Sequence, residues 1–97
     1  MLKKKPGRKG NVQVTFDLSD SVGAETVALC GDFNDWSPDA HPMKRLKKGL
    51  WRATVSLPAD ATYRFRYLLD GERWENDWEA DAYEPNGHGE DDSIVIV

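Results

Sequence analysis

The chain has 97 residues, which suffices for one domain but not for a catalytic barrel of about 250 residues. Its 39% hydrophobic and 31% charged residues are typical of a soluble globular protein, and no apolar run approaches the roughly 20 residues of a membrane helix. The net charge is −4, yet the first ten residues carry five of the 13 basic residues and no acidic one. We therefore expect a basic, disordered tail over residues 1–10, one domain over residues 11–97, and no nucleic-acid or membrane partner.

Short alternating runs separated by turn residues follow this tail. Apolar side chains alternate with polar ones from Val12 to Leu18, which predicts a half-buried strand, and Thr26 to Gly31 forms the next candidate strand. A polar loop with two aromatic residues spans Gly31 to Pro38, and Met43 to Leu46 is a candidate edge strand.

The second half of the chain continues the pattern and lacks any helical periodicity of useful length. Strands are expected over residues 51–57, 63–69, 72–75 and 94–97, with an acidic, turn-rich loop over residues 77–92. The sequence therefore predicts an all-β fold, an immunoglobulin-like β-sandwich of six to eight short antiparallel strands.

Catalytic and metal chemistry have little support in the sequence. Cys30 is the only cysteine, so no internal disulfide can form, and no secretion signal follows the basic N-terminus, which favours a cytoplasmic protein. His41 and His88 show no metal-ligand spacing, and no pair of carboxylates is marked as a glycosidase pair. We expect no catalytic residue, no metal and no cofactor.

Trp36 and Trp74 stand where burial is not the obvious explanation, the first in a polar loop and the second between Arg73 and Glu75. An exposed indole offers a large, flat apolar face that matches the apolar face of a pyranose ring. The alternative is that both tryptophans are core residues, because Trp is highly buried on average.

The turn at Asp70-Gly71 decides which face of the sheet Trp74 occupies. A two-residue loop pairs Tyr67 with Trp74 and makes Trp74 a core residue. A three-residue loop over Leu69 to Gly71 pairs Arg66 with Trp74 and puts both on the outer face. Spacing alone leaves both loops open.

Two motifs resemble those of glycogen-binding domains, carbohydrate-binding module family 48, which includes isoamylase N-terminal domains. The first is Val27-Ala28-Leu29-Cys30-Gly31-Asp32-Phe33-Asn34-Asp35-Trp36, which resembles the family signature V-x-L-x-G-x-F-N-x-W. The second runs from Leu57-Pro58 through Tyr63-Arg64-Phe65-Arg66-Tyr67-Leu68-Leu69-Asp70-Gly71 to Trp74. The resemblance covers residues 26–97 and implies an early-set immunoglobulin-like fold and α-glucan binding.

The resemblance also implies site residues. Trp36 and Trp74 correspond to the two tryptophans that stack on glucose, and Arg66 corresponds to a basic residue that binds sugar hydroxyls. Asn34 matches the family asparagine that positions the loop or contacts ligand, and Asp92 with Ser93 falls where other members carry amides.

The chain is similar to the glycogen-binding domain of the beta subunit of AMP-activated protein kinase, and one departure from such kinase-type members concerns the hairpin. Two residues, Glu72 and Arg73, separate Asp-Gly from Trp74, where those members have one. We therefore expect the three-residue loop, which keeps Trp74 on the face of Arg66. Trp78 and Tyr83 could extend the binding surface, but we expect them to pin the long loop to the sandwich.

These observations together predict a non-catalytic module that binds glycogen, starch or maltodextrin on a two-tryptophan platform. The alternative is a protein-interaction or regulatory module, associated with a glucan-active enzyme of the glycoside hydrolase family 13 type, whose sugar binding is weak or lost. Buried tryptophans would favour that alternative.

Overall fold

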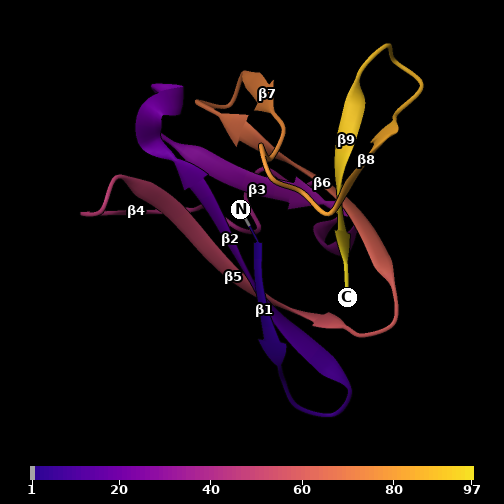
Figure 1. Cartoon of the computed structure of the whole chain (residues 1–97). Coiled ribbons are helices and arrows are strands. Elements are labelled where there is room, and N and C mark those ends of the chain that lie inside the picture. The colour runs from indigo at the N-terminus through magenta and orange to yellow at the C-terminus, as the bar shows by residue number, and fades with distance from the viewer. Residues whose placement is uncertain (1) are drawn as a thin grey trace.

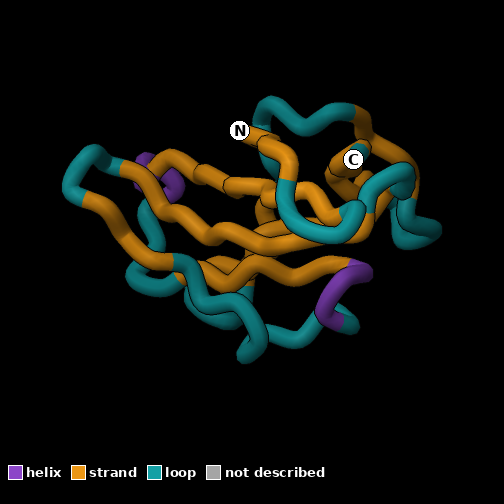
Figure 2. Tube along the Cα trace, turned by 90° about the horizontal axis from the view of Figure 1, so that it is seen from below, coloured by secondary structure: helices purple, strands orange, loops and turns teal. Residues whose placement is uncertain are grey.

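The computed structural model describes residues 2–97, which form two antiparallel sheets packed on one another (Figures 1 and 2). The first sheet has the strand order β1-β2-β5-β4, and the second has the order β3-β6-β9-β8, with β7 also paired to β6. The strands are β1 (Leu2–Pro6), β2 (Asn11–Ser19), β3 (Val27–Gly31), β4 (Lys44–Leu46), β5 (Leu50–Pro58), β6 (Thr62–Leu69), β7 (Arg73–Glu75), β8 (Ala82–Pro85) and β9 (Asp91–Ile96). The predicted all-β sandwich is confirmed, with nine strands among the described residues instead of six to eight. None of the helical turns in residues 2–97 has the length and apolarity that a membrane crossing requires.

The core lies between the sheets and is filled by the inward residues of each alternating run. Phe16 of β2 meets Phe65 of β6 edge to face, with ring centroids 5.0 Å apart, and Tyr67 continues the cluster at 5.7 Å from Phe65. All three side chains are fully buried. The alternation in the sequence therefore identifies the core-facing residues of these strands correctly.

The basic N-terminal segment is a strand, so the prediction of a disordered tail is wrong for Leu2–Pro6. Strand β1 pairs with β2 from Leu2 opposite Phe16 to Pro6 opposite Val12. Its lysines project from an edge strand, where Lys3 lies 3.8 Å from the carboxylate of Asp17. Charged residues are common on edge strands because they hinder pairing with another chain, and backbone pairing to β2 holds this one in place. Composition alone misses this kind of strand.

The β6–β7 hairpin has a three-residue loop, as expected, but in a different register. Leu68 pairs with Trp74 and Leu69 with Arg73, so the loop consists of Asp70, Gly71 and Glu72. The expected pairing of Arg66 with Trp74 is therefore wrong: Trp74 lies opposite Leu68, two residues further along β6. Because a shift of two residues keeps a side chain on the same face of the sheet, Trp74 still lies on the outer face. The face is the one predicted, although the pairing is not.

Asp70 holds this loop against the start of β3. Its Oδ1 accepts hydrogen bonds from the backbone N–H groups of Thr26 at 3.0 Å and Glu25 at 2.8 Å. These bonds, with that from Thr26 the larger cause, lower the pKa of Asp70. Asp70 and Gly71 both have positive φ, 53° and 69°, which suits an Asp-Gly turn. The turn is thereby fixed to the neighbouring strand.

Candidate functional site

A groove of about 340 Å³ lies on the outer face of the second sheet. It collects residues from the loop after β3, from β6 and β7, and from the β8–β9 turn. Its lining consists of Asp32, Trp36, Arg64, Arg66, Trp74, Asn86, His88 and Asp92. Four of the five residues predicted as a binding site, Trp36, Trp74, Arg66 and Asp92, therefore lie together.

A larger cavity of about 530 Å³ lies between the β1–β2 hairpin and the last residues of the chain. Its walls include Pro6, Val12 and Ile96, and no aromatic residue contributes to them. A sugar site needs aromatic faces together with polar groups. The smaller groove is therefore the better candidate.

The loop that carries Trp36 is built around a corner at Gly31. A Cβ atom at this position would lie 2.5 Å from the backbone oxygen of Arg64, so only glycine fits. The backbone N–H of Trp36 donates to the carbonyl of Gly31 at 2.9 Å. Asp35 and Trp36 have φ values of 55° and 57°, in the left-handed backbone region that residues other than Gly and Asn rarely adopt. The chain thus turns sharply enough to bring Trp36 over β6.

Asn34 supports this corner and does not line the groove. Its Oδ1 accepts from the N–H of Gly31 at 3.0 Å, and its Nδ2 donates to the carbonyl of Leu29 at 2.9 Å. The same Nδ2 lies 2.8 Å from Nδ1 of His41. Of the two roles that the resemblance implies for Asn34, loop positioning is the one that this geometry fits.

Asp32 is a groove residue that the sequence analysis missed. Its Oδ1 accepts from the indole Nε1 of Trp36 at 3.1 Å, and its Oδ2 accepts from the backbone N–H of Arg64 at 3.0 Å. The carboxylate therefore ties the indole ring to strand β6. Nothing in the local sequence distinguishes it from other loop acids, because its partner is 32 positions away.

Trp74 stands beside Trp36 with 42% of its surface exposed, while Trp36 is half-buried. The two ring centroids are 6.0 Å apart and the ring planes meet at 71°. The guanidinium carbon of Arg66 lies 5.6 Å from the centroid of Trp74, within the range of a cation–π contact. Neither tryptophan is a core residue, so the core alternative is wrong for both.

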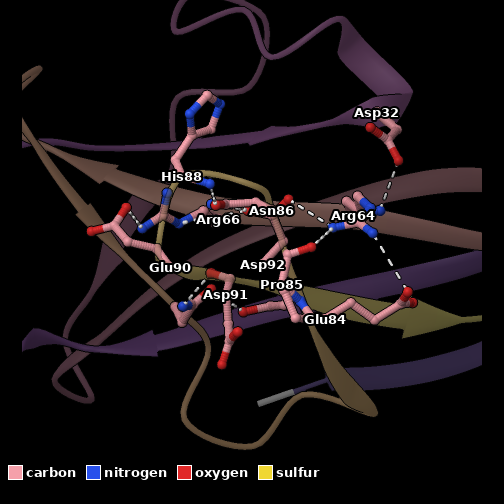
Figure 3. A network of polar contacts seen from close by, with 12 residues as sticks. Asp32, Arg64, Arg66, Glu84, Pro85, Asn86, His88, Glu90, Asp91 and Asp92 are labelled. Carbon is pink, nitrogen blue, oxygen red and sulfur yellow. Dashed lines mark hydrogen bonds and ion pairs between the residues drawn. The ribbon is translucent and has the colours of Figure 1, made fainter.

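Two arginines and several acids form the polar side of the groove (Figure 3). Arg66, only 8% exposed, bonds the carboxylate of Glu90 at 3.1 Å, and its Nε lies 4.0 Å from Oδ1 of Asp92. Arg64 donates to the other oxygen of Asp92 at 3.2 Å. Asp92 is 6% exposed and is thus a buried carboxylate between two guanidinium groups.

The β8–β9 turn supplies Asn86 and His88, which the sequence analysis did not place in the site. Asn86 bonds Asp92 at 3.3 Å through its Nδ2 and accepts from the backbone N–H of His88 at 2.9 Å. The segment Gly87-His88-Gly89 lies in the loop predicted to be rich in turns, and both glycines have positive φ. Turn residues gave no signal of a site because the turn reaches the groove only through the pairing of β8 with β9.

Ser93, also implied by the resemblance, is fully buried and lies outside the groove. Its hydroxyl accepts from the N–H of Asp77 at 2.9 Å and donates to Asn76 at 2.8 Å. It therefore helps to hold the segment between β7 and β8.

The same segment carries Trp78 and Tyr83, and neither lines the groove. The hydroxyl of Tyr83 donates to the carbonyl of Asp77 at 2.6 Å, which fits the expected role of pinning the loop. Trp78 is 56% exposed and its Nε1 donates to Glu75 at 2.8 Å. Two aromatic residues of this loop thus serve the loop itself.

The groove offers two apolar ring faces beside carboxylates, guanidinium groups and an amide. This combination suits a ligand with flat apolar faces edged by hydroxyl groups. Cys30 is buried beneath the Trp36 loop and does not line the groove. Burial raises the pKa of its thiol. No group of three or more His, Cys, Asp or Glu in residues 2–97 is placed to hold a metal ion.

Comparisons with known proteins agree with this chemistry. The family model of Carbohydrate-binding module 48 (Isoamylase N-terminal domain) matches residues 8–84. A 1,4-alpha-glucan-branching enzyme of Felis catus is 59% identical over 33 residues, which are 34% of this chain and 5% of the enzyme. The 1,4-alpha-glucan branching enzyme GlgB of Deinococcus radiodurans is 40% identical over 48 residues, 50% of this chain and 7% of the enzyme.

A GlgB 2 of Xanthomonas campestris pv. campestris is 40% identical over 47 residues, 47% of this chain and 6% of that branching enzyme. The chain therefore spans less than a tenth of the length of these relatives. The family match extends over most of the chain and includes both motifs of the sequence analysis, and it ends before the last strand, β9. This chain belongs to carbohydrate-binding module family 48, the family of isoamylase N-terminal domains.

Proposed function

We propose that the groove binds α-1,4-linked glucan on a platform formed by Trp36 and Trp74. The observation that carries the proposal is the placement of the two indoles in one groove, 6.0 Å apart and tilted by 71°. A module without its own catalytic machinery needs only such a surface.

The tilt of the rings favours a curved ligand over a flat one. Each indole can stack on one pyranose face, and a 71° angle between them requires that the stacked sugar rings also change orientation along the chain. An α-1,4-linked glucan curves in this way, whereas a β-1,4-linked glucan is a flat ribbon. The groove geometry therefore supports α-glucan over cellulose-like chains.

The polar residues supply the partners that hydroxyl groups need. A hydroxyl can both donate and accept, so it can bond a guanidinium N–H and a carboxylate oxygen side by side. Arg66 and Asp92 offer this pair within the groove. We assign Arg66 and Asp92 as the residues that orient the sugar.

The names of the matched relatives support the same ligand, since each is a 1,4-alpha-glucan branching enzyme. Because this chain covers so little of them, a partnership with a glucan-active enzyme is a separate proposal. Co-purification of such an enzyme on the immobilised protein would test that partnership. Maltoheptaose added to the wash shows whether the enzyme is held through bound glucan.

The direct test is a titration of maltoheptaose followed by tryptophan fluorescence. A saturable signal is expected with a dissociation constant in the micromolar to millimolar range, about −4 to −8 kcal/mol, and cellohexaose should give none. Trp36→Ala and Trp74→Ala should each weaken binding about tenfold or more. Trp78→Ala is the matched control, because it removes an exposed tryptophan outside the groove and should leave the affinity unchanged.

Absence of saturation by millimolar maltoheptaose would overturn the proposal. The protein-interaction alternative would then be the better account of the fold. Equal losses in all three tryptophan variants would also contradict the platform, because they would show that position in the groove does not matter.

A further inference from the structure

The charged groups of the groove are unequal in number, and this bears on which glucans it admits. Two guanidinium groups, from Arg64 and Arg66, belong to it. Four carboxylates surround them, those of Asp32, Glu84, Glu90 and Asp92, of which Asp32 and Asp92 line the groove and the other two bond the arginines. The balance is two negative charges around the site, within a chain that itself carries −4.

Both arginines are also paired with carboxylates of the chain. Nη2 of Arg66 donates a hydrogen bond to the carboxylate of Glu90 at 3.1 Å (Figure 3). Arg64 donates to Asp92 at 3.2 Å, to Glu84 at 3.5 Å and to the carbonyl of Pro85 at 3.3 Å. Recognition of phosphate or sulfate favours an open guanidinium fork that can bond two oxygens at once. Each guanidinium group here already faces two carboxylates, those of Glu84 and Asp92 for Arg64 and those of Glu90 and Asp92 for Arg66, so acids of the same chain balance its charge.

Among residues 2–97, no lysine and no third arginine lines the groove. Arg73, which precedes Trp74, lies 3.9 Å from the carboxylate of Asp70 at the hairpin loop. The carboxylates of Asp32 and Asp92 have lone pairs left for further donors, which hydroxyl groups supply and the oxygens of phosphate or sulfate esters do not. Charge and hydrogen bonding therefore favour the same kind of ligand.

We infer that the groove is selective for uncharged α-glucan and rejects glucan chains that carry phosphate or sulfate esters. The inference rests on the proposed function and adds the charge of the ligand to it. The carboxylates that hold the arginines are the residues that enforce the rejection.

The test compares β-cyclodextrin with its derivative sulfated at every primary hydroxyl, so that each ring that reaches the groove carries a charge. At low ionic strength the neutral ring should bind and the sulfated ring should bind at least about tenfold more weakly. In 1 M NaCl, where the screening length falls to about 3 Å, the difference should shrink. Equal affinities at low salt, or a difference that salt does not change, would overturn the inference, the latter because it would indicate steric exclusion.

Paired variants locate the effect. The double variant Glu84→Gln, Glu90→Gln removes two negative charges beside the arginines and should reduce the low-salt difference between the two rings. The control Glu25→Gln, Glu79→Gln makes the same change in net charge at residues that do not line the groove and should leave the difference intact. An equal reduction in the control would assign the effect to the charge of the whole molecule and overturn the inference.

The two hypotheses fail in different ways. If neither ring binds, the proposed function fails and this inference falls with it. If the neutral ring binds and the sulfated ring binds equally well, only the inference fails.

Discussion

Strand β6 carries a polar network on each of its faces, and the two are built differently. On the inner face, the hydroxyl of Tyr67 donates to Asp77 at 2.6 Å, and Asp77 also accepts from the N–H of Glu79 at 2.7 Å. Both Tyr67 and Asp77 are at most 1% exposed. On the outer face, Arg66 bonds Glu90, whose side chain is 59% exposed, and faces a groove that is open to ligand.

The inner network is closed, because each group that it brings together is satisfied by another part of the chain. Burial, and then the nearby carboxylate of Asp77, raises the pKa of Tyr67 well above its usual value, so its hydroxyl remains a donor. The outer network leaves Nε of Arg66 without a hydrogen bond in residues 2–97. A buried network whose groups are all satisfied serves stability, and an unpaired buried group is costly, so the outer network is less suited to that role.

Asp77→Ala should give the largest effect and should act on stability alone. It removes the acceptor of a buried tyrosine hydroxyl and of a loop N–H, which together should lower the free energy of unfolding by about 3 kcal/mol. Urea denaturation measures this loss. The affinity for β-cyclodextrin, measured without urea, should be unchanged, and a parallel loss of affinity in the folded variant would break the comparison between the two faces.

Asn34→Ala should lower both the stability of the fold and the affinity for glucan, because Asn34 supports the groove residue Trp36 without lining the groove. Loss of its bonds to Gly31 and Leu29 leaves part-buried backbone groups unpaired, at a cost of about 2 kcal/mol in unfolding free energy. Trp36 should then lose its fixed position, and maltoheptaose affinity should fall too. Retention of full affinity would show that the corner at Gly31 holds Trp36 without Asn34.

Arg66→Met should act on binding and have little effect on stability. The substitution keeps the aliphatic volume, and Asp92 retains its bonds from Arg64 and Asn86, so unfolding free energy should change by less than about 1 kcal/mol. Affinity for maltoheptaose should fall about tenfold through the lost donors and the lost contact with Trp74. Calorimetric titration and urea denaturation of the same sample separate the two effects, and a loss of stability equal to that of Asp77→Ala would show that the outer network is structural.

The smallest expected effect is a loss of stability in acid. It involves the ion pair of Asp17 and Arg52, which belongs to neither network of β6. Arg52 donates to both oxygens of Asp17, at 2.7 and 2.9 Å, and this bonding is the main reason that the pKa of Asp17 is lowered. A carboxylate with a lowered folded-state pKa contributes stability that is present above its unfolded pKa of about 3.9 and is lost as the pH falls through the folded value.

Stability should therefore decline below about pH 4, and Asp17→Asn should flatten that decline while lowering stability at pH 7. Asp70, whose pKa is also lowered, should keep part of the decline in the variant. Urea midpoints measured between pH 3 and pH 7 give the comparison. An unchanged acid slope in the variant would mean that Asp17 is not a source of it.

Much of the fold follows from the sequence because alternation reports which residues face the core. It identifies Phe16, Phe65 and Tyr67 as inward residues, and the structure buries all three. It fails for β1, whose lysines are held by backbone pairing to β2. It fails also for β8, a short exposed strand inside the acidic loop, because pairing with β9 and not local composition creates that strand.

A site residue can be predicted from the sequence only where its residue type and its motif identify it. Trp36, Trp74 and Arg66 are identified in this way. Asp32 and His88 are ordinary loop residues in the sequence and enter the groove only because distant segments meet there, as Asp70 meets the residues before β3. Long-range contacts of this kind leave no local signal.

The left-handed backbone at Trp36 has a consequence for how such a module can change over generations. An L-residue with a side chain costs about 1 kcal/mol or more in this conformation, and glycine avoids most of that cost. Without selection for ligand binding nothing would oppose replacing this tryptophan, since natural proteins are rarely at their stability optimum and stabilising substitutions are easy to find. A copy released from ligand binding should lose Trp36 early, before the buried residues that hold the corner beneath it.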